Sequence, residues 1–479
     1  MASWRKTPAV QCKFRYGAWL SLAGIVAGGC AHYHAAPLAP QHSADEFAAR
    51  RLDQAQLRDD ISRLMPQAAA VWPPREWDRA ELLAVALTQN PQLAVARSQV
   101  AAALSREISA AQIPNPDLTL QSEYARHDPH PWLYGVSLNW LLRSPERRRL
   151  EGDIARLDTG NARLQLMNEA WAVRSALAAA LSEWEGGRRR LTLLTQLAAA
   201  QDRLLALEKQ RVAAGEDSPT EIVSAQQARI QIEQQEAESR ESVNAAQAAA
   251  AKALGLPLQA LDGMSLAWAD WGEPPPLAEA AQRAAREEAL LSRADLGVAI
   301  GEYSAAEAKL QQSIARQYPQ FVLSPGYYWD HGIAKFPFDV GFTLPFNGNR
   351  GEIAEARAGR DLAGQRMLAL QAGIYGEIVA AERAEHIARE STDAAERQLQ
   401  AARRQQQSAD LGLKLGASDL QEQLSAAIVA TRAELEVVQM RSELQDSRNT
   451  LEDVLHAPLS GPELALAKSL PSLASGGVP

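Results

Sequence analysis

Two stretches of the chain alternate between large apolar and small or polar residues. The alternation runs through residues 133–142 and 337–346, and a second candidate strand precedes each of them, at residues 117–124 and 320–329. About ten residues with one apolar and one polar face have the length and pattern of a tilted strand that crosses a bilayer. The sequence therefore predicts two pairs of membrane-spanning strands.

Four strands are too few to close a barrel, because known single-chain barrels have about eight strands or more. We therefore expect several copies of the chain to form a pore together. The small or polar positions of the alternating strands would line its lumen. The candidates are Ser137, Asn139, Asp339 and Thr343.

Helical periodicity fills most of the remaining chain. It predicts a helix over residues 78–111, and then a long helix that begins at Pro145 and ends near residue 213. At a rise of 1.5 Å per residue, this long helix would measure about 100 Å, which is far more than a globular domain needs. A turn at residues 215–219 leads into a return helix over 220–254, and a matching turn lies near residues 412–418.

The second half of the chain repeats the first. Leu93 and Leu296, and likewise Pro116 and Pro319, are 203 residues apart, which indicates a tandem duplication. We expect a mainly α fold with a transmembrane β-barrel part. Its predicted divisions are a signal at 1–29, a lead-in at 30–77, repeats at 78–255 and 278–458, a linker at 256–277 and a tail at 459–479.

The N-terminus has the pattern of an export signal. Four basic residues precede the apolar stretch Ala18–Ala27, and the sequence Ala27–Cys30 resembles a bacterial lipoprotein box. This pattern predicts that Cys30 is lipidated and becomes the first mature residue. An ordinary secretory signal with an incidental cysteine is the alternative.

Composition excludes several classes of function. The formal charge of −9 argues against nucleic acid as the main partner, and no stretch of the sequence is long and apolar enough for a membrane-spanning helix. The sequence contains no phosphate-binding glycine loop, no H-E-x-x-H and no G-x-S-x-G. We therefore expect no catalytic residues, no cofactor and no metal ligands.

Several motifs resemble the TolC-type outer-membrane factor (outer membrane efflux protein) family, over residues 78–458. They are "NPQLAVARSQVAAA" and "PNPDL" in the first half, and "YPQFVLSPGYYWDHG" and "GFTLPFNGNRGEIAEARA" in the second. The last two are closest to the heavy-metal branch served by RND pumps. The resemblance implies a homotrimer in the outer membrane, with a twelve-stranded barrel and a tunnel of long antiparallel helices that extends into the periplasm.

The resemblance also implies a function and partners. The trimer would be a passive exit duct for divalent heavy-metal cations, delivered by an inner-membrane RND pump through a periplasmic adaptor. Export of drugs or organic toxicants, or type I secretion of a protein, are the alternatives within this class. A lipid-anchored periplasmic coiled-coil adaptor is the alternative from another class, and the two strand pairs argue against it.

Further site residues follow from the same resemblance. The two turns are similar to the family's hairpin tips, where adaptors dock, and their candidate residues are Gly215, Ser218, Gly416 and Ser418. Glu422 aligns with an aspartate that lines the family's periplasmic aperture, and Glu221 is its counterpart in the first repeat. Ordinary helical-hairpin turns and solvated acids remain the alternatives. Ser425 replaces the family's second acid, which weakens the proposed gate.

Overall fold

The computed structural model describes residues 33–65 and 72–467, which fall into two compact units divided after Ala49. The described part of the first unit contains one helix, α2 (Pro40–Ala48). The predicted signal and Cys30 lie outside the described residues. The second unit, from Arg50 onward, contains all the other helices and strands of the described residues.

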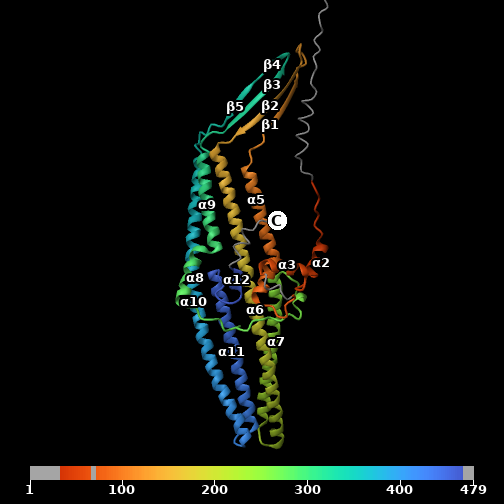
Figure 1. Cartoon of the computed structure of the whole chain (residues 1–479), viewed down its shortest axis with the longest axis vertical. Coiled ribbons are helices and arrows are strands. Elements are labelled where there is room, and N and C mark those ends of the chain that lie inside the picture. The colour runs from red at the N-terminus through yellow and green to blue at the C-terminus, as the bar shows by residue number, and fades with distance from the viewer. Residues whose placement is uncertain (1–32, 66–71, 468–479) are drawn as a thin grey trace, which may run out of the picture. The chain divides into compact units, whose positions relative to one another are not determined.

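In chain order, the first half of this unit has a pair of strands between two sets of helices, and Figure 1 shows the strands together at one end of the long helices. No helix within residues 33–65 and 72–467 is long and apolar enough to cross a membrane. In chain order the elements are α3 (Ala55–Leu64), α4 (Arg79–Gln89), α5 (Pro91–Ala111), β1 (Asp117–Tyr124), β2 (Trp132–Leu142), α6 (Pro145–Ala214) and α7 (Pro219–Leu254).

The second half has the same order of elements. After a short 3-10 helix, η2 (Leu258–Leu261), come α8 (Glu279–Ser292), α9 (Ala294–Ala315), β3 (Phe321–Asp330), β4 (Ile333–Lys335), β5 (Phe338–Phe342), α10 (Arg350–Leu415), α11 (Leu420–Leu455) and α12 (Glu463–Ala467). The long helices α6 and α10 have 70 and 66 residues, and the return helices α7 and α11 have 36 each. These matched lengths confirm the predicted duplication within a mainly α fold.

The single helix predicted over residues 78–111 is wrong. Asn90 is extended, with φ −66° and ψ 123°, and it separates α4 from α5. Pro91 has no backbone N–H to donate to the preceding turn, and it disfavours the α conformation in the residue before it. The Asn90 side chain then accepts a hydrogen bond from the Gln92 N–H and caps α5.

The strands form one antiparallel sheet in which β1, β2 and β3 are neighbours. β3 pairs with β4 near one end and with β5 near the other, so the fourth strand is in two pieces. This corrects the predicted strand over 337–346, which begins at Ile333 and ends at Phe342. Pro337 interrupts the strand because it cannot donate to a ladder. The hairpin turn is only His331 and Gly332, with φ values of 49° and 90°.

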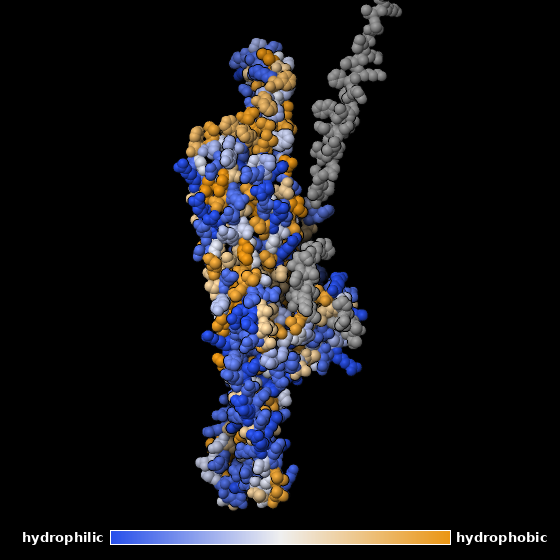
Figure 2. Space-filling view, turned by 60° about the vertical axis from the view of Figure 1, so that its left-hand side comes forward, coloured by the Kyte–Doolittle hydropathy of each residue, from blue (hydrophilic) through white to orange (hydrophobic). Residues whose placement is uncertain are grey.

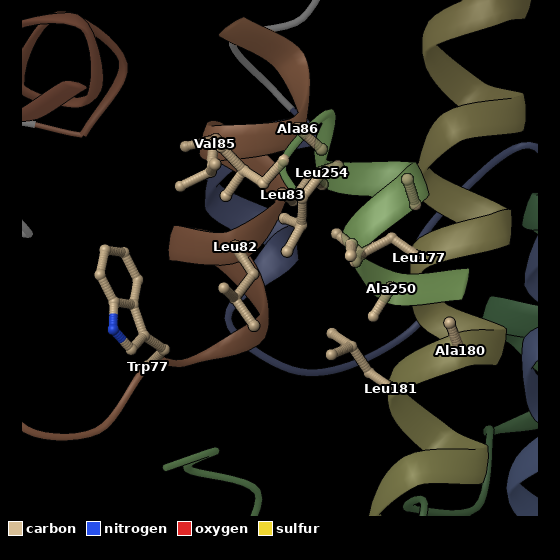
Figure 3. Packing of buried hydrophobic residues seen from close by; sticks show 14 of the residues in the cluster. Trp77, Leu82, Leu83, Val85, Ala86, Leu177, Ala180, Leu181, Ala250 and Leu254 are labelled. Carbon is tan, nitrogen blue, oxygen red and sulfur yellow. The ribbon is translucent and has the colours of Figure 1, made fainter. Parts of the chain in front are cut away.

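The largest hydrophobic core lies midway along the helices, where α3 and α4 pack with α6 and α7. Leu82 of α4 faces Leu181 of α6 and Ala250 of α7, and all three are buried (Figure 3). Trp77, just before α4, extends this core. Leu57 and Ile61 of α3 belong to the same core, and full burial of such a side chain contributes about 1.5–3 kcal/mol, so α3 is an integral part of it.

Candidate functional site

The sheet has one apolar and one polar face. Figure 2 shows apolar surface gathered over the strands. The residues of the apolar face are large and mostly exposed. Leu118 is 63% and Leu120 75% exposed, whereas leucine side chains in a water-soluble protein are most often buried in the core. The face comprises Leu118, Leu120, Trp132, Tyr134, Trp140, Leu142, Phe321, Tyr327, Phe338, Val340 and Phe342.

The opposite face carries a polar row that crosses all four strand positions. In register, Asp117 of β1 is opposite Asn139 of β2, and Ser324 of β3 is opposite Asp339 of β5. The Ser324 hydroxyl donates to Asn139 Oδ1 at 2.7 Å, which joins the two halves of the row. Asn139 Nδ2 also donates to Thr119 Oγ1 at 3.1 Å.

The four predicted lumen residues are placed as follows. Ser137, Asn139 and Asp339 lie on this polar face, and Ser137 is 9% exposed. Thr343 is exposed and lies just after the end of β5, outside the strand. It lines a cavity between the sheet and the helices together with Arg143 and Arg316. That these residues line a channel stays a prediction.

Arg147, in the first turn of α6, joins this helix to the end of α9 next to the sheet. Its guanidinium is buried and donates to the carbonyl oxygens of Ala315 and Tyr318, at 3.1 Å and 2.8 Å from Nη2. Burial lowers the pKa of Arg147, with the nearby positive charge of Arg316 as a further cause. Because Arg147 belongs to the first repeat and its acceptors to the second, it joins the repeats below the strands.

Each hairpin tip turns at a glycine in the left-handed conformation. Gly215 has φ 75° and Gly416 has φ 69°, a region that glycine enters without the steric cost of a Cβ. Ser218 caps α7 by accepting the Thr220 N–H. Ser418 does not cap the next helix. Asp419 is the N-cap of α11, because its carboxylate accepts the Glu422 N–H at 2.8 Å.

The two aperture candidates are both exposed. Glu221 lies in the first turn of α7 and Glu422 in the first turn of α11. Glu422 and Ser425 line one shallow hollow with Asp419. Negative side chains in the first turn interact favourably with the helix dipole, so their position has a local structural cause. A role as an aperture stays a prediction.

A set of polar contacts, which the sequence did not reveal, links the two tips. Arg211 of α6 pairs with Asp217 in its own tip, and its Nη1 lies 3.6 Å from Asp419 Oδ2 in the other tip. Gln421 Nε2 donates to Glu208 Oε1 at 3.0 Å. Burial raises the pKa of Glu208, and the charges of Asp217 and Glu221 add to this effect. The tips of the two repeats are thus held together within one chain.

Among the described residues, no group of three or more His, Cys, Asp or Glu side chains could hold a metal ion. The candidate site has two parts at opposite ends of the long helices. It comprises the polar face of the sheet at one end of the long helices and two linked tips at the other (Figure 1).

Comparisons with known proteins agree with this architecture. Residues 82–256 match the model of a family described as Outer membrane efflux protein. No match was found among curated protein sequences. Several solved structures share the fold. A membrane protein from Pseudomonas aeruginosa is 20% identical with a TM-score of 0.66, and the alignment covers 79% of this chain and 93% of that one.

Two further structures are similar. The outer membrane protein VceC from Vibrio cholerae is 17% identical, with a TM-score of 0.64 over 80% of this chain and 97% of its own. The open state of the MtrE outer membrane channel of Neisseria gonorrhoeae is 16% identical, with a TM-score of 0.64 over 80% of this chain and 89% of its own. At these identities the likeness establishes the fold.

Proposed function

We propose that the chain, of which residues 82–256 match the model of the family described as Outer membrane efflux protein, is the outer-membrane channel of a three-part efflux system. It is a passive duct that catalyses no reaction. Three copies form it, with their strands in the outer membrane and their helical tips in the periplasm. The observation that carries this proposal is the open, two-faced sheet.

The sheet of a single chain has two unpaired edges, at β1 and at the β4/β5 strand. Inside a bilayer an unpaired edge is too costly, because no water satisfies its N–H and C=O groups. Each chain contributes an even number of strand positions with alternating direction, so β1 of one copy can pair antiparallel with β5 of the next. Three copies then close a barrel of twelve strands with its apolar face outward.

The cargo proposed is divalent heavy-metal cations. Asp117 and Asp339 end the polar row on each chain, and both are exposed. In a closed trimer the row becomes a ring in which six carboxylates face the lumen, and rings of acids favour cations. Glu221 and Glu422 add negative charge at the opposite end of the duct.

The partners proposed are a periplasmic adaptor and an inner-membrane RND pump. The tips at Gly215 and Gly416 are exposed turns at the ends of long helices, and Ser218 and Ser418 flank them. An adaptor hairpin docks there.

The outer-membrane anchor includes a lipid on Cys30 in addition to the barrel. We expect Cys30→Ala protein to remain in the outer-membrane fraction, because its barrel still holds it there.

The test is metal tolerance in a strain that lacks the gene. We expect the deletion to raise intracellular zinc, copper or cadmium and to lower tolerance, with restoration by the wild-type gene. Asp117→Asn combined with Asp339→Asn should restore tolerance only in part, because the acidic ring is lost. A hydrophobic drug is the control cargo. Restored drug tolerance without any effect on metals would refute the cation assignment and leave the duct itself intact.

A further inference from the structure

Two glycines form a slot in the polar face of the sheet, and an aromatic ring fills it. Gly135 of β2 is directly opposite Tyr328 of β3, and Ser137 is directly opposite Gly326. A Cβ at Gly135 would lie 2.0 Å from Tyr328 Cδ1 and 2.6 Å from Cε1. A Cβ at Gly326 would lie 3.0 Å from Tyr328 Cε2. The tyrosine ring thus occupies the space above both glycines.

This position makes the ring lie along the sheet instead of standing away from it. Contacts to Cγ, Cδ1 and Cε1 show that one long edge of the ring rests on Gly135. On the other side the ring reaches Gly326 in its own strand. Ser137 lies beside the slot. Among the described residues of the strands it is the one buried residue, and all the others are partly or fully exposed.

The Tyr328 ring lies on the polar face of the sheet, and this position determines what the ring would contact in a trimer. Tyr328 shares its face with Ser324 and Asp330 by strand alternation, so it lies on the polar face and not among the apolar side chains that would contact lipid. In the trimer of the proposed function, on which this inference rests, that face lines the lumen. Three tyrosine rings then lie on the wall of the duct at one level.

We propose that Gly135 and Gly326 hold the Tyr328 ring flat against the barrel wall and that Tyr328 thereby sets the free cross-section of the duct at this level. Any side chain at Gly135 must displace the ring, because backbone pairing at this position prevents the strands from moving apart. Because the ring lies against this face of the sheet, a ring lifted off it moves toward the lumen of the proposed trimer. A displaced ring narrows the pore in all three copies at once, and pore diameter governs what a duct conducts.

The experiment is single-channel conductance of purified trimers in planar bilayers, with Gly135→Val as the main variant. Gly341→Val is the matched control, because Gly341 lies on the same face in β5 and nothing lies within 4 Å of its Cβ position. Both variants add the same atoms to the lumen. We expect Gly135→Val to conduct less than Gly341→Val, and Gly135→Val/Tyr328→Ala to recover the conductance of Gly341→Val.

Two results would overturn the proposal. One is equal conductance for the Gly135→Val and Gly341→Val proteins, and the other is a loss that persists after Tyr328→Ala is added. If Gly135→Val does not insert, Gly326→Ala decides, since its Cβ lifts the other edge of the ring and should lower conductance to a smaller degree. A wild-type protein that does not conduct would refute the proposed duct, whereas conducting variants without these differences would refute only the role of Tyr328.

Discussion

Arg174 should be the most sensitive single position for the packing of the two repeats. It lies in α6, and its side chain is 3% exposed between Glu452 of α11 and Glu463 of α12, which are 2% and 4% exposed. Arg174 Nε donates to Glu463 Oε2 at 2.8 Å, and Nη2 contacts both carboxylates. Burial opposes the charge of Arg174, but the two acids outweigh it and raise its pKa.

Arg174→Met leaves two acids buried without a cation. Removal of one partner from a buried ion pair costs about 3–5 kcal/mol, because the remaining charge keeps its desolvation penalty. Stacking of the guanidinium over Trp171, at 5.0 Å from the ring centre, contributes roughly 0.5–2 kcal/mol more. For a chain of 479 residues, a loss of this size lowers the apparent melting temperature by roughly 4–7 °C.

The assay is loss of helical circular dichroism on heating the detergent-solubilised protein. Arg403→Met is the control, because the Arg403–Glu434 pair also joins two long helices at 2.7 Å but its side chains are 55% and 27% exposed. Exposed pairs contribute about 0–1 kcal/mol, so this variant should melt almost like the wild type. The triple variant Arg174→Met/Glu452→Leu/Glu463→Leu should regain much of the loss. Equal melting temperatures for Arg174→Met and Arg403→Met would refute the reasoning.

Three further predictions concern the sheet, the tips and a partly buried histidine. Leu120→Arg should reduce the amount of heat-modifiable trimer in outer-membrane fractions, since an arginine on the lipid-facing side of a strand costs about 2–4 kcal/mol at mid-bilayer. The control Gln121→Arg, one residue away on the polar face, should leave the amount of trimer unchanged. Arg211→Ala should raise bilayer conductance by freeing Asp419 from the other tip, and the exposed Lys209→Ala, which removes the same charge, should leave it unchanged. Burial, with the positive charge of Arg293, lowers the pKa of His456 to about 4 despite Asp295 and Asp453. The unfolded chain therefore binds a proton that the folded chain does not between pH 6.5 and 4, and stability should fall by about 1–2 kcal/mol as the pH drops through this window. His456→Asn keeps the left-handed backbone (φ 51°) accessible and should flatten the dependence of melting temperature on pH.

The sequence predicted those features that depend on a local pattern of residues. Alternation identified β1 and β2, and proline and glycine marked the ends of α6 and the tip at Gly215. The same reasoning failed where a pattern was interrupted. Ala334 and Lys335 look like loop residues before Pro337, yet the first of these pairs with Trp329 and the second with Tyr328.

The sequence alone did not predict contacts between segments that are far apart along the chain. Asp117 lies on the polar row only because the register places it opposite Asn139, and the alternation of β1 alone does not give that pairing. The glycine slot for Tyr328 likewise depends on the pairing of β2 with β3. Arg211 and Glu208 are ordinary helix residues in sequence, and only the approach of the second tip makes them partners of Asp419 and Gln421.

The central claim is that three open sheets close into one conducting barrel. The most direct measurement is the conductance of the purified, detergent-extracted protein after insertion into planar lipid bilayers, with the oligomer isolated by size-exclusion chromatography. The account predicts that the trimer fraction produces discrete ohmic channels that prefer cations over anions. A folded, helical protein that elutes as a monomer and never produces channels would contradict it.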